Sequence, residues 1–105
     1  MKTLILTIVF LLFCNTTLAD QIYIFSASWC GPCKSLKSFL LQNPKLVEGH
    51  SVSTIDIDDY QELKEKFNIS AVPTTIIMRD NKEQARIRGF NSSIWGSWIK
   101  RNLSN

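Results

Sequence analysis

The sequence has few cysteines, a single histidine and no cluster of basic residues. Its 3 cysteines are too few for a small domain held together by several disulfides. The formal net charge is only +3, and the acidic residues are interspersed among the basic ones. Nucleic-acid-binding domains usually gather Lys and Arg on one face, so that class is disfavoured. With 45% hydrophobic and 20% charged residues, a chain of 105 residues fits one globular domain rather than a disordered or fibrous chain.

The first nineteen residues differ from the rest of the chain. Lys2 is followed by an apolar run over residues 4–14, then by polar residues and finally by the small residue Ala19. This order is typical of a secretory signal peptide, and the run is shorter than the roughly 20 residues that a membrane-spanning helix needs. We therefore expect residues 1–19 to be a signal peptide cleaved after Ala19, with an uncleaved N-terminal anchor as the alternative. In either case, we expect residues 20–105 to form a secreted or periplasmic domain.

Without the signal peptide, the chain keeps two cysteines, Cys30 and Cys33. A disulfide between residues this close in sequence closes a very short loop, so its value as a structural crosslink is small. Reactivity or metal binding is the better explanation for the pair. A zinc site needs four ligands, and the rest of the domain offers only His50 and no third cysteine. We therefore expect neither a metal nor an organic cofactor.

The spacing of apolar residues predicts an α/β domain. Alternating or β-prone segments predict strands, and apolar residues at helical spacing predict helices. The strands are expected over residues 21–25, 52–57, 74–78 and 84–88, and the helices over residues 34–41, 60–67 and 94–103. We expect Asp58 or Asp59 to cap the second helix, and Asn91 or Ser92 to cap the third. The order of elements is β-α-β-α-β-β-α.

The segment Trp29-Cys30-Gly31-Pro32-Cys33 lies between the first expected strand and the first expected helix. At the helix N-terminus, Cys30 meets the positive end of the helix dipole and unpaired backbone N–H groups, and both stabilise a thiolate. Cys33, one helical turn further on, can attack a mixed disulfide and release the product. Gly31 and Pro32 suit the tight entry into the helix. The expected catalytic residues are therefore Cys30 and Cys33, with Gly31 and Pro32 in support.

The WCGPC segment, placed between a strand and a helix, resembles the active site of the thioredoxin family. Residues 71–74 resemble the family's loop with a cis proline, and residues 88–90 resemble the glycine that follows its last strand. The similarity covers residues 22–103. It implies a thioredoxin-like fold in a minimal form, with a four-stranded mixed sheet flanked by helices.

The resemblance also implies a function. It implies a thiol–disulfide oxidoreductase that acts on protein thiols and disulfides and exchanges electrons with an upstream dithiol donor or acceptor. Trp29, Val72 and Pro73 are then expected on the substrate face, with a cis Val72–Pro73 bond that faces Cys30. We expect a monomer that binds no nucleic acid and touches a membrane only through an uncleaved N-terminal segment.

Three positions depart from the family pattern. Ile24 stands where thioredoxins carry a buried acid that assists proton transfer at the second cysteine, and Thr54 stands where they carry the accompanying lysine. Ser38 replaces the proline that kinks the active-site helix. The family's first strand and helix also have no counterpart in residues 20–105. These differences argue against reduction as efficient as that of cytosolic thioredoxins, although thiol exchange is still expected.

The residues between the two cysteines bear on the direction of thiol–disulfide exchange. Gly31-Pro32 between the cysteines resembles the reducing members of the family, which favours a reductase. Secretion would place the protein where thiol oxidants and isomerases also act, so these are the alternatives. Another alternative is a module that binds clients without catalysing thiol exchange. Loss of one cysteine would indicate such a module, and both cysteines are present. A structural or metal-carrying domain is the remaining alternative.

Overall fold

A computed structural model describes residues 19–104, so the expected signal peptide, apart from Ala19, lies outside the described residues. The elements are β1 (Gln21–Ser26), α2 (Gly31–Gln42), the 3₁₀ helix η1 (Pro44–Val47), β2 (Ser51–Asp56), α3 (Gln61–Lys66), β3 (Thr74–Arg79), β4 (Lys82–Arg88) and α4 (Ser92–Asn102). The expected order of strands and helices is confirmed, and η1 is an addition that we did not predict. No helix in the described range is both long enough and apolar enough to cross a membrane.

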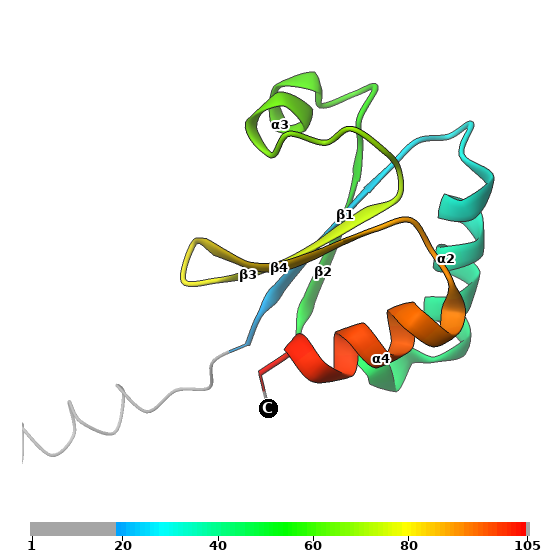
Figure 1. Ribbon diagram of the computed structural model, residues 1–105, viewed down its shortest axis with the longest axis vertical. Coiled ribbons are helices and arrows are strands. Elements are labelled where there is room, and N and C mark those ends of the chain that lie inside the picture. The colour runs from blue at the N-terminus through cyan, green and yellow to red at the C-terminus, as the bar shows by residue number, and fades with distance from the viewer. Residues whose placement is uncertain (1–18, 105) are drawn as a thin grey trace, which may run out of the picture.

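The four strands form one mixed sheet in the order β2-β1-β3-β4 (Figure 1). The strand β1 pairs in parallel with β2 and antiparallel with β3, and β3 pairs antiparallel with β4. Asp80 and Asn81 join β3 to β4, and both have a positive φ, of 54° and 62°, as a two-residue hairpin turn requires. The predicted four-stranded mixed sheet is therefore confirmed.

The alternating side chains of β1 reach two separate cores. On one face, Ile22 and Ile24 pack with Leu36 of α2 and with the fully buried Trp95 of α4. On the other face, Phe25 lies close to Phe67, which follows α3, and the ring centroids are 5.5 Å apart. The helices α2 and α4 thus cover one face of the sheet, while α3 stands apart from them (Figure 1). The second core continues past the end of β1 to Cys30 and Cys33, where the predicted site begins.

The start of α3 differs from our prediction. The residue that caps the helix is Tyr60, and its side chain makes no capping hydrogen bond, so neither Asp58 nor Asp59 is the cap. Asp58 is engaged elsewhere: its backbone N–H donates to Asp56 Oδ1 at 2.8 Å, and its carboxylate accepts a hydrogen bond from Trp29. The helix α3 has six residues, and Tyr60 is exposed instead of lying on the apolar face of the helix.

The residue before β1 joins that strand to the C-terminal end of the chain. The carboxylate of the fully buried Asp20 accepts hydrogen bonds from Arg79 Nε at 2.7 Å, from Arg79 Nη2 at 2.8 Å and from the Ser104 backbone N–H at 2.8 Å. The Asp20 backbone N–H donates to His50 Nδ1 at 2.9 Å. Hydrogen bonding to Arg79 lowers the pKa of Asp20 from 3.8 to about 2. We call Asp20, His50, Arg79 and Ser104 the Asp20 cluster.

Candidate active site

Cys30 ends the loop after β1 and is the N-cap residue of α2. Its backbone is extended, with φ −93° and ψ 111°, and its N–H donates to the Ala27 carbonyl at 3.1 Å. Gly31 and Pro32 follow as the first two residues of α2, where the missing N–H of proline costs the helix nothing. The predicted position of Cys30 at a helix N-terminus is therefore confirmed, and the helix begins three residues earlier than the apolar pattern suggested.

The sulfurs of Cys30 and Cys33 form a disulfide, with an S–S distance of 2.15 Å and Cα atoms 5.3 Å apart. Cys30 Sγ also accepts a hydrogen bond from the Cys33 backbone N–H at 3.1 Å. This N–H belongs to the first turn of α2, whose donors have no partner within the helix. When the disulfide is reduced, a negative charge on Cys30 Sγ meets this donor and the positive end of the helix dipole. The geometry thus favours Cys30 as the thiolate.

Trp29 lies beside the disulfide with its ring in solvent. The residue is 67% exposed, which is compatible with the expected place on the substrate face, and its Nε1 donates to Asp58 Oδ2 at 3.0 Å. This hydrogen bond ties the loop before α2 to the loop after β2. A large aromatic surface is therefore held next to Cys30 by a partner that comes from a different part of the chain.

The loop before β3 completes the site. The Val72–Pro73 peptide bond is cis, as predicted. Val72 packs against the core cluster that contains both cysteines, and Pro73 is fully buried. The Pro73 carbonyl accepts a hydrogen bond from the Gly89 N–H at 2.7 Å, and Gly89 has a φ of 81°, in the region that favours glycine. The structure therefore brings the WCGPC segment and the proline loop to one core, while contact of Val72 and Pro73 with a substrate stays a prediction.

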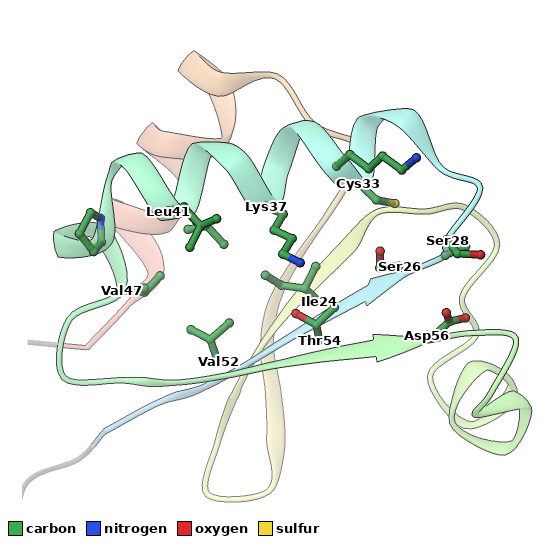
Figure 2. Close-up of a pocket in the computed structure, with 14 residues that line it drawn as sticks. Ile24, Ser26, Ser28, Cys33, Lys37, Leu41, Val47, Val52, Thr54 and Asp56 are labelled. Carbon is green, nitrogen blue, oxygen red and sulfur yellow. The ribbon is translucent and has the colours of Figure 1, made fainter.

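A groove of about 500 Å³ lies behind Cys33, between α2 and the strands β1 and β2 (Figure 2). Ile24, the residue at the family's acidic position, lines it and is 5% exposed, so it is a buried neighbour of the cysteine site. Thr54 lines the groove as well. Lys37 of α2 also enters it, and our sequence reasoning missed this residue because a lysine in an amphipathic helix usually points to solvent.

The structure does not bring His50 to the cysteines. His50 belongs to the Asp20 cluster at the start of β1, whereas Cys30 follows the end of that six-residue strand, so the two are separated by about 20 Å. Among residues 19–104, no group of three or more His, Cys, Asp or Glu side chains is arranged to hold a metal ion. The Cys30–Cys33 pair is a dithiol that can open and close a disulfide.

A disulfide at the N-terminus of a helix, a cis-proline loop that packs against the same core and a four-stranded mixed sheet together define a domain of the thioredoxin-like structural class. The thioredoxin family model matches residues 14–100, and the chain belongs to the thioredoxin family. The resemblance that we drew from the WCGPC segment is thereby confirmed.

Individual relatives agree with this result. The chain is 37% identical to the thioredoxin of Chlamydia caviae over 66 residues, which are 63% of this chain and 65% of the relative. It is 34% identical to the mitochondrial thioredoxin-2 of Schizosaccharomyces pombe over 85 residues, or 79% and 64% of the two chains. The chain spans between 53% and 65% of the length of the first curated relatives that it matches.

The fold agrees as well. The structure superposes on the thioredoxin of Fasciola hepatica with a TM-score of 0.74 at 26% identity, over 90% of each chain. The thioredoxin-like fold with a minimal four-stranded sheet, expected from the sequence, is confirmed.

Proposed function

We propose that the chain is a thiol–disulfide oxidoreductase that reduces disulfides of protein clients through Cys30 and Cys33. One observation carries this proposal: Cys30 Sγ caps α2, is bonded to Cys33 Sγ and accepts the Cys33 N–H at 3.1 Å. One sulfur thus has the surroundings of a stabilised thiolate, and the second lies within bonding distance of it. Membership of the thioredoxin family supports the same chemistry.

The reaction has two exchange steps. The Cys30 thiolate attacks one sulfur of a client disulfide, the client S–S bond breaks, and the other client sulfur leaves as a thiolate that takes a proton from water. Cys33 then loses its proton and attacks Cys30 Sγ, so the mixed disulfide breaks and the second client thiolate departs. The two electrons of the Cys30–Cys33 dithiol have then passed to the client. An upstream dithiol donor returns the pair to the reduced state.

The client contacts the exposed surface around Cys30. Trp29 offers an aromatic face on one side of the cysteine, and the Val72–Pro73 loop packs against the core that holds the cysteine. The backbone groups of Val72 can pair with an extended client segment in the way that an added strand pairs with a sheet edge. This contact would place the client disulfide beside the thiolate. We propose that the protein binds clients as a monomer.

The roles of the two cysteines are tested by trapping. Cys33→Ser removes the resolving sulfur, so mixed disulfides with clients should accumulate and be visible by non-reducing electrophoresis. Cys30→Ser removes the nucleophile and should trap none. Equal trapping by both variants would contradict the assignment, and a wild-type chain that binds clients but does not reduce them would make it a binding module.

The direction is tested by the equilibrium potential of the Cys30–Cys33 pair against glutathione. Thioredoxin has a potential of about −270 mV and the periplasmic oxidant DsbA about −120 mV, a difference of roughly 7 kcal/mol for two electrons. The Gly31-Pro32 pair favours a potential near the reducing end. A potential near the oxidising end would instead support the alternative, a secreted thiol oxidant or isomerase.

We also propose that the protein is secreted or periplasmic and is cleaved after Ala19. The charged, apolar and small-residue order of residues 1–19 supports this. Cleavage at this point would keep Asp20, and with it the Asp20 cluster, in the mature domain. Mass spectrometry of the exported protein should show a chain that begins at Asp20, and an exported chain that begins at Met1 would support the uncleaved anchor.

A further inference from the structure

The groove behind Cys33 has apolar walls and a cation directed into it. Ile24 of β1, Val52 of β2 and Leu41 of α2 supply apolar surface. Figure 2 shows the Lys37 side chain extending from α2 toward Ile24 and Thr54, on the side of the helix that faces the strands. The Lys37 side chain therefore reaches over the groove from α2, and the residue is exposed to solvent.

Cys33 and Lys37 lie on the same face of α2. They are four residues apart, and side chains at this spacing in a helix have Cβ atoms about 5–6 Å from each other. Both residues line the groove. In the part of the chain that the structure describes, the ion pairs join Asp20 to Arg79 and Glu83 to Arg86, so Lys37 belongs to neither. Its charge is available to an anion that forms in the groove.

Few other charges face the groove. The residues that β1 and η1 contribute are uncharged, and α2 adds Lys34 next to Cys33. The one carboxylate is Asp56 at the end of β2, and its Oδ1 already accepts the Asp58 N–H at 2.8 Å. Figure 2 places Asp56 beyond Thr54, near Ser28, while Lys37 lies over the middle of the groove. The charge on the α2 side of the groove is therefore positive.

We propose that Lys37 is a positioning residue for the second exchange step, in which its ammonium stabilises the Cys33 thiolate. The inference rests on the proposed function, because it concerns the resolution of the mixed disulfide. Cys33 gives its proton to water, the thiolate attacks Cys30 Sγ, and the client sulfur leaves as a thiolate. Lys37 exchanges no proton in this step. Since Ile24 offers no base, the population of the Cys33 anion limits the rate, and a nearby positive charge raises that population.

The first test measures Cys33 alone, in a Cys30→Ser background. The rate of alkylation of Cys33 by iodoacetamide is followed against pH. In Lys37→Met the midpoint of this profile should move up by about 0.5–1 pH unit, which is less than a buried ion pair would give because Lys37 is exposed. Lys37→Arg keeps the charge and should restore the midpoint. Lys100→Met, on the exposed surface of α4, changes the net charge equally and should leave the midpoint in place.

The second test measures resolution with both cysteines present. A mixed disulfide formed on Cys30 should resolve about two- to fourfold more slowly at pH 7 in Lys37→Met, because the smaller thiolate population is partly offset by the higher nucleophilicity of a more basic thiolate. Lys37→Arg should resolve at the wild-type rate. An unchanged midpoint in Lys37→Met, or a shift no larger than that of Lys100→Met, would overturn this inference and leave the proposed function untouched. A wild-type chain that forms no mixed disulfide would overturn the proposed function, whatever the alkylation profile shows.

Discussion

The two ends of β1 differ in how their polar groups are paired. At the first end, Asp20 is buried and its carboxylate accepts three hydrogen bonds from Arg79 and Ser104. Beyond the other end, Cys30 Sγ accepts a hydrogen bond from a single backbone N–H, that of Cys33. Lys37 takes no part in the ion pairs of the described residues, which join Asp20 to Arg79 and Glu83 to Arg86. A strand of six residues therefore separates a buried, fully hydrogen-bonded carboxylate from the two cysteines of the candidate site. We expect that substitutions at one end of β1 leave the other end unchanged.

The largest effect on the rate of disulfide reduction is expected from Cys30→Ser. Disulfide reduction should fall to the uncatalysed rate, because no other sulfur in the domain caps α2. The unfolding free energy should match that of the reduced wild-type chain, since the Asp20 cluster is unchanged. Turnover of a protein disulfide and urea unfolding measure the two quantities. Residual catalysis in Cys30→Ser would mean that Cys33 can act as the nucleophile.

Ile24→Asp would place an acidic residue where thioredoxins carry one, near Cys33, and should lower the unfolding free energy. A carboxyl buried beside Cys33 can accept its proton, so reduction near neutral pH should become faster. Burial of this group should lower the unfolding free energy by about 2–3 kcal/mol, because the carboxyl is desolvated. Urea unfolding and turnover rates measure both effects.

Two further variants sharpen this test. Ile24→Asn places a polar group of similar size without the proton acceptor, and should destabilise the domain without speeding reduction. Combining Ile24→Asp with Lys37→Met should cost about 1 kcal/mol more than the sum of the single changes, since the new carboxylate loses its cation. Unchanged rates and full stability in Ile24→Asp would show that position 24 does not influence Cys33.

Asp20→Asn, before the first residue of β1, should lower the unfolding free energy and leave disulfide reduction unchanged. The pKa of Asp20 is about 2 in the folded protein and 3.8 in the absence of its partners, which corresponds to about 2 kcal/mol. Because the folded pKa is the lower one, this stabilisation is present above about pH 4 and is lost as the pH falls toward 2. The unfolding free energy of the wild type should therefore drop over this window.

In Asp20→Asn the drop should be smaller and the stability at pH 7 lower by about 2 kcal/mol. Urea unfolding at several pH values measures the effect, and disulfide reduction at pH 7 serves as the control, because Cys30 lies about 20 Å away. A loss of reductase activity in a folded Asp20→Asn chain would contradict the independence of the two ends.

The smallest effect is expected for the hydrogen bond between Trp29 and Asp58. The partners are exposed, so Asp58→Asn should change the unfolding free energy by less than about 1 kcal/mol. Its consequence should be a more mobile Trp29 ring, seen as a shift and broadening of the indole N–H resonance, and a change of client reduction of about twofold. Trp29→Phe, which removes the donor and keeps an aromatic ring, is the matched control.

The position of the two cysteines at the start of α2 was predictable because its signal is local. Five consecutive residues carry the two sulfurs and the entry into α2, so the sequence places them correctly without knowledge of the rest of the fold. The strands were predictable for a similar reason, since alternation within β1 directs Ile24 and Phe25 to opposite faces. Both features depend on residues that are near one another in the chain.

The features that we missed depend on contacts between distant residues. Arg79 reaches Asp20 across 59 positions, and neither residue belongs to a motif. Asp58 or Asp59 was expected to cap α3, but the Asp58 carboxylate accepts a hydrogen bond from Trp29, 29 residues away. Lys37 is distinguished from other helix lysines only by the strands that α2 packs on. Side-chain pairing of this kind is decided by the tertiary structure, which spacing along the chain does not encode.

The position of β2 has a consequence for how molecules of this protein behave in concentrated solution. Within residues 19–104, β2 pairs with β1 on one side and with no strand on the other, so a row of backbone N–H and C=O groups faces outward. Such an edge is a template on which the strand of another molecule can add. The exposed side chains there are mainly those of serine and threonine, with Val52 as the large apolar exception at 39% exposure. Colloidal stability of the domain therefore depends on the polarity of this strand, a property that neither the disulfide nor the core controls.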